Sequence, residues 1–263
     1  HLAMKKQKQN RKTYGGSGEN LGGVVIMGTP KKENSLPGQG LPSQNQPATT
    51  TVEQNNPPTS EPVLLNNHVV ISEVQITGGA GQTTNDFIEL YNPTDAAFNL
   101  KGHRLVKRTK IGTSDTSIKS WTSDVFIPAK GFYLWANSGY AGIAITPDAT
   151  TTATIADDNG IALRQGDEDA GTIIDSVVWG EAQNVFVEGV NAAAAGANQS
   201  IERRAFQNNV CIFASGSGEF LGNGCDTDNN QNDFELRALP RPQNSQSFPE
   251  PRSAPTAVSN FNA

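Results

Sequence analysis

The sequence has 263 residues, of which 20 are Lys or Arg and 26 are Asp or Glu, so its formal net charge is −6. Residues 1–32 carry a net +6 and the rest of the chain carries −12. The acidic body argues against nucleic acid as its partner, because phosphate binding rests on clustered Lys and Arg. The basic start is typical of a segment beside an anionic membrane, or of a solvated stub.

Proline divides the chain into a body and two arms. Seven of the 15 prolines lie in residues 1–66 and four in 241–263, whereas residues 68–239 contain three. Proline has no N–H for a β ladder and collects outside sheets. The Gln-, Asn-, Thr- and Pro-rich runs of the first arm bury too little apolar surface to offset chain entropy. We therefore predict a disordered linker at 1–66, a folded body at 67–240 and a flexible tail at 241–263.

The start of the chain says little about a natural leader. Residues 1–3 (His-Leu-Ala) resemble a cloning remnant, so we expect a leader or anchor to have been removed. The one apolar run of the first arm, Val24–Met27, is far shorter than the roughly 20 residues that span a bilayer.

The body consists of short β-branched or aromatic segments separated by Gly, Asn, Asp or Pro, which is typical of strands. No stretch sustains a helical apolar period beyond two turns, and the Ala-rich patch 192–195 is bracketed by glycines. The pattern predicts an all-β fold, an antiparallel β-sandwich. The expected strands are 69–77, 86–92, 103–108, 124–127, 131–136, 160–164, 172–179 and 200–204.

Two glutamates, Glu73 and Glu89, lie inside these apolar segments. A buried carboxylate without a partner is costly, so we expect each to be paired as a structural buried acid. Bidentate pairing with Arg104, Arg203 or Arg204 would satisfy them. A ligand-binding role is the alternative.

Cys211 and Cys225 are the two cysteines of the chain and lie fourteen residues apart. A disulfide closing such a loop contributes roughly 3 kcal/mol in the chain-entropy model. The alternative is two inert thiols, and two cysteines alone do not make a four-ligand zinc site. A disulfide would indicate an oxidising compartment.

Residues 226–233 (DTDNNQND) are the best candidate for a metal site. Asp226, Asp228 and Asn230 place oxygens at alternate positions, as in the opening of a calcium loop, and Asp233 adds another. The loop is not an EF-hand, because its sixth position is Gln231 instead of Gly. The alternative is an ordinary turn, since Asp and Asn favour turns.

Seven segments of the body form a recognisable series: ISEVQI (71–76), FIELYNPTDAAFNLKGHRL (87–105), IPAKGFYLWAN (127–137), IALR (161–164), IIDSVVWG (173–180), NQSIERR (198–204) and DTDNNQNDF (226–234). Taken together, they resemble the lamin tail domain family in its bacterial form, over about residues 68–240. The resemblance implies an immunoglobulin-like sandwich that serves as a binding or tethering module of secreted or membrane-anchored proteins. His103 stands where the family usually has Trp after the Gly, which would change a core contact.

Little in the sequence indicates catalysis. The body contains two histidines, His68 and His103, and neither a GxSxG elbow nor an HExxH motif. We expect no enzyme activity and no cofactor other than calcium. Of the tryptophans, Trp135 and Trp179 lie in apolar strands and suit a core, whereas Trp121 lies in a polar stretch and could be exposed.

The sequence thus predicts a non-catalytic binding or tethering module of a secreted or cell-surface protein, with a protein or an envelope polymer as partner and a monomer by default. One alternative is a calcium-dependent carbohydrate-binding module that uses the 226–233 loop and Trp121. The other is a structural shaft domain held by an internal Lys–Asn isopeptide bond.

Overall fold

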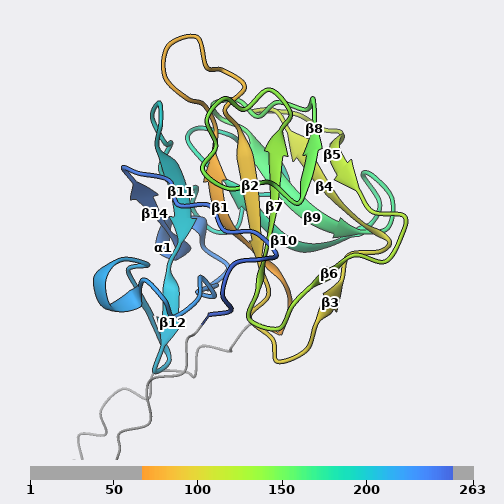
Figure 1. Ribbon diagram of the computed structural model, residues 1–263. Helices are drawn as coiled ribbons and strands as arrows, with labels where there is room; N and C mark the ends of the chain where they lie inside the picture. Colours follow the sequence, from red (N-terminus) through yellow and green to blue (C-terminus); the bar gives the residue numbers. More distant parts are fainter. Residues whose placement is uncertain (1–66, 251–263) are drawn as a thin grey trace, which may run out of the picture. The chain divides into compact units, whose positions relative to one another are not determined.

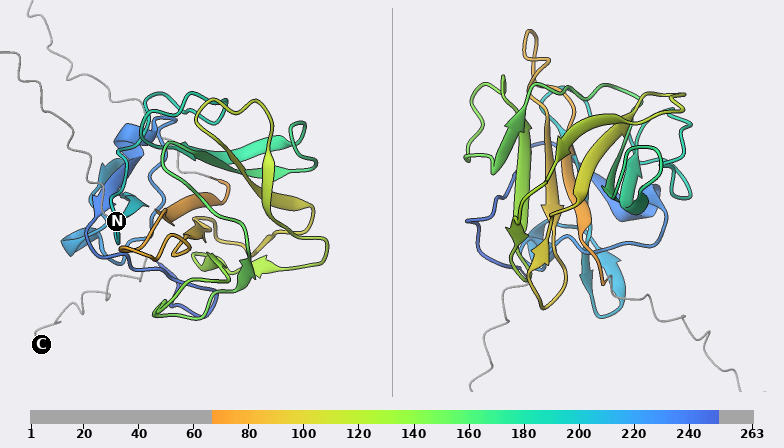
Figure 2. Two further views of the ribbon diagram at one scale, coloured as in Figure 1. Left: turned by 90° about the horizontal axis from the view of Figure 1, so that it is seen from above. Right: turned by 90° about the vertical axis from the view of Figure 1, so that its right-hand side faces the viewer.

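The structure, a computed structural model, describes residues 67–250, and nearly all of its regular structure is β (Figure 1). The expected linker at 1–66 and residues 251–263 of the expected tail lie outside the described residues. Figure 2 follows the same strands from above and from the side.

The first layer is a six-stranded sheet. Its neighbours are antiparallel, except for the parallel pair β7–β8 at one edge. The other edge is β14, beside β11 (Figure 1). In spatial order the strands are β14 (Phe234–Arg237), β11 (Ser200–Arg203), β1 (Val70–Gln75), β2 (Phe87–Tyr91), β7 (Phe132–Asn137) and β8 (Ala149–Thr151).

The second layer is a four-stranded antiparallel sheet. Its order is β10 (Thr172–Val178), β9 (Gly160–Gln165), β4 (His103–Arg108) and β5 (Thr116–Ser120). The remaining elements are short: the strand pairs β3 (Phe98–Asn99) with β6 (Phe126–Ile127) and β12 (Ala205–Gln207) with β13 (Val210–Ile212), the 3₁₀ turn η1 (Gly216–Gly218) and the helix α1 (Asn230–Asp233).

The main core lies between these two layers. Alternation along each strand directs one set of side chains inward. From the first sheet, Val74, Ile88 and Trp135 face the interior, and Leu105 and Ile161 of the second sheet meet them in one apolar cluster. The predicted all-β, immunoglobulin-like sandwich is confirmed.

Two β-bulges interrupt the alternation. One lies in β1 between Ile71 and Glu73, and the other lies in β10 between Ile173 and Asp175. A bulge adds a residue to one strand and redirects the side chains beside it. In this protein both bulges adjoin charged side chains that are buried.

Several strands differ from the expectation because their sequences lack an apolar repeat. β5 (TSIKS) lies in a stretch that the sequence leaves as a loop, and its Ile118 is buried against the core. β8 and β14 are three- and four-residue edge strands and were also not expected. The Ala-rich patch is not helical: Ala192 forms a β-bridge with Trp179. Among the described residues no helix has the length and apolarity needed to cross a membrane.

The C-terminal boundary of the body corrects the expectation of a flexible tail from residue 241. Residues 241–250, here called the C-terminal strap, cross the outer face of the six-stranded sheet as the dark blue segment in Figure 1. The backbone N–H of Arg241 donates to Glu73 at 3.1 Å, and that of Gln243 donates to Glu89. Tyr91 donates its hydroxyl proton to the carbonyl of Glu250. The strap is fixed because it supplies donors that buried carboxylates require.

The strap leads to a prediction about truncation. A chain ending at Pro240 loses the N–H donors to Glu73 and Glu89, whereas a chain ending at Glu250 keeps them. We expect the shorter chain to melt at least about 5 °C lower, since 1 kcal/mol shifts Tm by about 2–4 °C in a domain of this size. Differential scanning calorimetry of both chains measures this. Equal melting temperatures would show that the strap does not stabilise the body.

Candidate functional site

The 226–233 loop does not gather the four expected calcium ligands around one point. Asp228 lies exposed with φ +54°, in the left-handed region. Asn230 is fully buried, and its side chain accepts from the N–H of Val178 at 2.9 Å and donates to the carbonyl of Ser176 at 3.2 Å. Asp226 faces Arg203, with 3.4 Å between Oδ1 and Nη1. Asp226 and Asp233 thus lie near Arg203, whereas the Asn230 side chain bonds to β10 and Asp228 is exposed.

Asp233 holds the loop in shape. Its carboxylate accepts from the N–H of Thr227 at 3.0 Å, from the hydroxyl of Thr227 at 2.7 Å and from the N–H of Asn229 at 3.3 Å. The side chain of Asn229 in turn caps the first turn of α1 by accepting from Asn232. These donors occupy the carboxylate oxygens of Asp233, so the segment forms an Asx-rich turn in the structure, and the calcium site stays a prediction.

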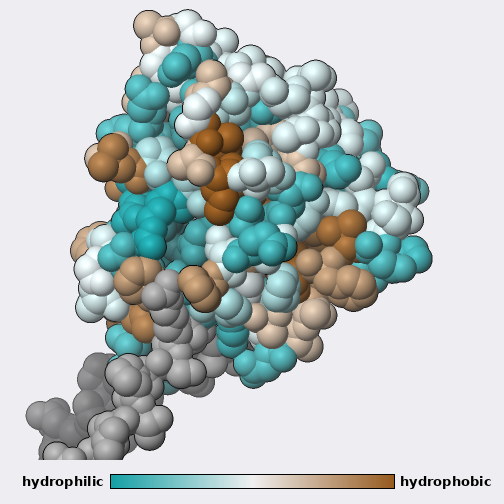
Figure 3. Space-filling model, viewed as in Figure 1, coloured by the Kyte–Doolittle hydropathy of each residue, from teal (hydrophilic) through white to brown (hydrophobic). Residues whose placement is uncertain are grey.

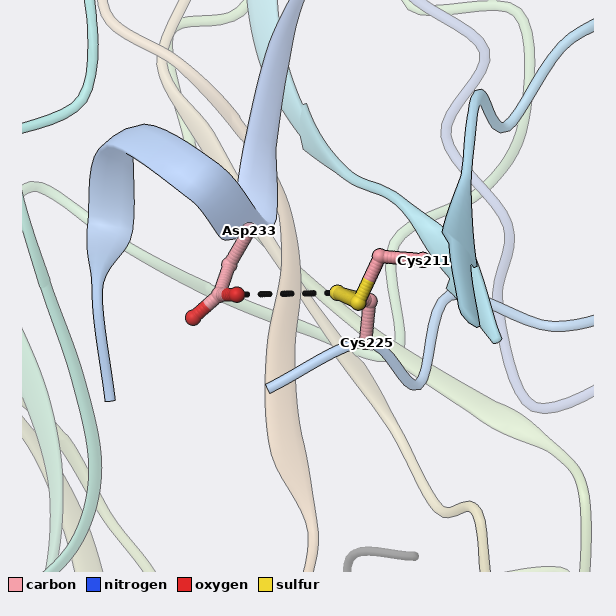
Figure 4. Close-up of side chains that lie close together, drawn as sticks. All are labelled: Cys211, Cys225 and Asp233. Carbon is pink, nitrogen blue, oxygen red and sulfur yellow. Dashed lines mark hydrogen bonds between the residues drawn. A yellow bond between two sulfur atoms is a disulfide. The ribbon is translucent and has the colours of Figure 1, made fainter. Parts of the chain in front are cut away.

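A disulfide joins Cys211 in β13 to Cys225 beside the loop (Figure 4). Oδ1 of Asp233 lies 3.5 Å from the Cys225 sulfur. A disulfide sulfur carries no proton to donate, so the loop N–H groups are the donors that satisfy this carboxylate. The disulfide fixes the β12–β13 hairpin against the loop.

Arg203 is the charged centre of this region. It projects from β11 into the space between the sheets, and its side chain is fully buried. Its Nη2 contacts both oxygens of Asp175 on β10 at 2.8 and 2.9 Å. Its other nitrogens donate to the carbonyls of Ile71 at 2.8 Å and Cys225 at 2.9 Å, and its guanidinium lies over the Phe234 ring at 4.6 Å. One side chain therefore joins both sheets to the disulfide segment.

His68 closes the cluster at the start of the body. Its Nε2 lies 3.5 Å from Asp226 Oδ2, and this hydrogen bond raises the pKa of His68. His68 and Arg203 together hold the pKa of Asp226 below its usual range, against the effect of burial. The ligand atoms of His68, Asp175 and Asp226 lie within 4.8 Å of one another, the spacing of a metal site. The guanidinium of Arg203, however, already supplies positive charge at this point.

A second cluster is a row of four glutamates across the outer face of the six-stranded sheet. The strand register places Glu89 beside Glu73, Glu73 beside Glu202, and Glu202 beside Glu235. The first three are at most 7 % exposed. Each has hydrogen-bond donors: Ser72 for Glu89, Ser200 for Glu73, Asn223 for Glu202, and the N–H of Ala214 for Glu235.

The partners of Glu73 and Glu89 correct the expected arginine pairing. The donors are serine hydroxyls and strap N–H groups, whereas Arg203 binds Asp175 and Arg104 binds the exposed Asp167 and Glu168. Among the described residues no Lys or Arg side chain pairs with Glu73 or Glu89, whereas Arg237 pairs with Glu202, and burial has the largest effect on the pKa of all three. Burial raises the pKa of Glu73 to about 7 and that of Glu202 to about 8, and burial together with the charges of Glu73 and Glu202 raises the pKa of Glu89 well above its ordinary value.

The aromatic residues leave no carbohydrate platform at Trp121. Trp121 is 4 % exposed and donates its indole N–H to the hydroxyl of Tyr133 at 3.1 Å, which corrects the expectation of an exposed ring. Trp135 and Trp179 are fully buried, as expected of core residues. His103 packs against the ring of Phe98 with 4.9 Å between centroids.

Residues 67–250 contain five lysines, and four of them have polar partners that bear on the isopeptide alternative. Lys101 pairs with Asp124, and Lys110 pairs with Asp158 and Glu181. The amines of Lys107 and Lys130 donate to the carbonyls of Thr154 and Pro93. None of these pairs is the buried Lys–Asn pair that the shaft alternative requires.

The sequence did not single out the loop after β10, which presents an exposed groove of about 520 Å³. Val185, Val187 and Val190 are 58, 36 and 50 % exposed, whereas Phe186 between them is fully buried. The sequence signal for this loop is the run VFVEGV, but its alternation does not show which of the apolar side chains are exposed. We call residues 180–191 the valine loop. Its groove is lined by Gly180, Ala182, Gln183, Asn184, Val187, Gly189, Val190 and Asn191.

Contacts of the buried residues of the valine loop hold its backbone in place. Phe186 packs under the guanidinium groups of Arg108 and Arg164, at 5.2 and 5.3 Å from its centroid. The carboxylate of Glu188 accepts from the hydroxyl of Ser176 at 2.9 Å. Asn184 accepts from the N–H of Phe186 at 3.1 Å. The exposed valines therefore project from a fixed backbone, which lowers the entropy lost on binding.

Comparison with known proteins gives one family match. The family described as Lamin Tail Domain matches residues 65–181. Strands β11 and β14, the disulfide and the strap lie beyond the matched residues, although β11 and β14 complete the same sheet. No curated protein matches the chain.

Among solved structures, a DUF4876 family protein from Bacteroides thetaiotaomicron VPI-5482 is similar at 11 % identity with a TM-score of 0.43. The match covers 64 % of this chain and 70 % of that one.

The buried ion pair leads to a prediction. In Arg203→Met, Asp175, Asp226 and Asp233 lose their counter-charge, and breaking a buried pair in this way costs about 3–5 kcal/mol. Urea unfolding followed by tryptophan fluorescence measures the loss. Arg204→Met is the matched control, because Arg204 lies over the exposed Phe213 ring at 5.0 Å and should lose no more than about 1 kcal/mol. Equal losses in the two variants would contradict the central role of Arg203.

The glutamate row leads to a prediction about pH. Because burial raises the pKa of Glu73 to about 7 and that of Glu202 to about 8, the folded state keeps protons that the unfolded state releases above its ordinary pKa of about 4.5. The free energy of unfolding should therefore fall as pH rises from about 5 to 8. His68, with its raised pKa, acts in the same direction.

Glu73→Gln removes one of these titrations, so its stability should depend less steeply on pH over that window. The exposed Glu181→Gln serves as the control for the same chemical change and should keep the parent slope. Urea unfolding at half-unit pH steps gives both slopes. A parent protein that is more stable at pH 8 than at pH 5 would reverse the expected sign.

Proposed function

Because the chain belongs to the lamin tail domain family through residues 65–181, we propose that it is a non-catalytic binding or tethering module of a secreted or cell-surface protein. Its partner in this proposal is a protein or a cell-envelope polymer. The observation that carries the proposal is the valine loop, where three apolar side chains are exposed and two of them, Val187 and Val190, line a groove. Apolar groups that remain exposed together mark interaction surfaces.

The polar and charged interior supports a binding role over catalysis. Arg203 and the acids around it bind one another, and the strap binds Glu73 and Glu89 of the glutamate row. A catalytic acid or base needs access to a substrate proton within hydrogen-bond reach. These groups instead stabilise the sandwich, so recognition falls to exposed side chains such as Val185.

The disulfide supports the proposed location outside the cytosol. Disulfides persist in oxidising compartments and are rare in the cytosol. Cys211 and Cys225 are joined, which suits a secreted or surface-displayed domain. In the same proposal the polar segment 1–66 acts as a spacer with a reach of roughly 45 Å, and its basic start lies near an anionic membrane.

Binding to a cell-envelope fraction tests the proposal. We expect the full chain to bind this fraction and Val185→Asp to bind at least about tenfold more weakly, because a charge in an apolar contact loses affinity. Val210→Asp is the matched control, since Val210 on β13 is 57 % exposed against 58 % for Val185. Pretreating the fraction with protease separates a protein partner from a polymer.

Two outcomes would refute this assignment. If both aspartate variants bind like the parent chain, the valine loop is not the recognition surface. If the parent chain binds no envelope component before or after protease treatment, the tethering role fails as well.

A further inference from the structure

The free edge of the six-stranded sheet is formed by β14, which pairs on one side with β11. The N–H of Arg204 donates to the carbonyl of Asp233 at 2.7 Å, so these two residues are a hydrogen-bonded pair at the end of the β11–β14 ladder. Hydrogen-bonded and non-hydrogen-bonded residue pairs alternate along an antiparallel ladder. Counting from Asp233, Glu235 and Arg237 therefore direct their backbone N–H and carbonyl groups toward β11. Leu236 lies between them and directs its N–H and carbonyl groups away from the sheet.

This edge is open to a further strand. Leu236 is 48 % exposed and Leu239 is 82 % exposed. A shallow groove of about 410 Å³ runs beside the strand, lined by Ser215 and residues 235–239. An unpaired edge with an exposed apolar side chain is a template for strand addition.

We propose that β14 pairs antiparallel with β14 of a second copy of this chain, across a two-fold axis at Leu236. The sequence of the strand is self-complementary in this register. Leu236 meets its own copy, and its outward N–H and carbonyl groups exchange two hydrogen bonds. Glu235 lies directly opposite Arg237 of the second copy, and the same pair repeats on the other side of the axis.

The charges favour a second copy over an unrelated strand. Opposite charges directly across an antiparallel pair stabilise it, and like charges destabilise it. Glu235 and Arg237 share the outer face of the sheet, where Arg237 already approaches Glu202 with 2.5 Å between Nε and Oε2. An added Glu235 from the second copy extends this row of alternating charge.

The interface is small, so the association is weak. A four-residue strand buries far less than the roughly 1,200 Å² of a stable interface. We expect a monomer–dimer equilibrium with Kd on the order of 100 µM. The dimer would be populated where many copies are held on one surface, because their local concentration is high there. Higher salt should weaken it, because its ion pairs are at the edge of the sheet.

A charge-reversal pair tests the proposal on the full chain by sedimentation velocity from about 10 µM to 1 mM. Glu235→Arg places Arg opposite Arg, and Arg237→Glu places Glu opposite Glu, so each variant alone should associate at least about fivefold more weakly than the parent. An equimolar mixture restores both opposite-charge pairs and should associate like the parent. Asp167→Arg, at a side chain that is 92 % exposed on the β9–β10 turn, controls for net charge and should behave as the parent.

The mixture also guards against misfolding, because a variant that had lost β14 could not be rescued by its counterpart. Leu236→Lys places like charges at the two-fold axis and should also weaken association. A parent chain that stays monomeric up to 1 mM overturns the proposal. So does a dimer that both charge reversals leave intact, or a mixture that associates no better than its components.

Discussion

The contact between Arg203 and Asp175 is the constraint on which the rest of the domain depends. Arg203 belongs to the six-stranded sheet and Asp175 to the four-stranded sheet, so this ion pair, in which Nη2 of Arg203 donates to both oxygens of Asp175, fixes the two layers relative to each other. Asp175 also accepts from the N–H of Ile71 at 2.6 Å. Both Ile71 and Asp175 lie at β-bulges, where the redirected backbone makes these contacts available. A buried pair of this kind adds specificity of register more than net stability.

The two faces of the six-stranded sheet are buried by different kinds of contact. The inner face is apolar and packs on the second layer, whereas the outer face carries the glutamate row and is covered by the strap. The strap bonds to Glu73 and Glu89 through backbone N–H groups, which any sequence can supply. Burial raises the pKa values of these carboxylates, whereas the N–H groups of the strap lower them by donating to the charged form.

The fold could be predicted from the sequence where strands alternate or carry β-branched runs, as in VVISEVQIT and DFIELYN. It could not be predicted at β5 and β14, because TSIKS and FELR owe their strand geometry to neighbours instead of to a pattern of their own. The burial of Glu73 followed from its apolar strand, but its donor at Arg241 lies 168 residues away and leaves no side-chain signature. The role of the aspartates of residues 226–233 could not be predicted for a similar reason: Asp and Asn supply oxygens equally well to calcium and to loop N–H groups.

The short helix α1 connects the valine loop to the β14 edge. The N–H of Asn230 donates to the carbonyl of Glu188 at 3.0 Å, and that of Gln231 donates to the carbonyl of Val190 at 2.8 Å. The first turn of α1 thus holds the valine loop, and its last residue, Asp233, leads directly into β14. Asp233 also lies 3.8 Å from Arg203, so the buried cation steadies the β14 end of this connection. The valine loop and the β14 edge are therefore joined through the four residues of α1, by backbone hydrogen bonds at one end and by the continuous chain at the other.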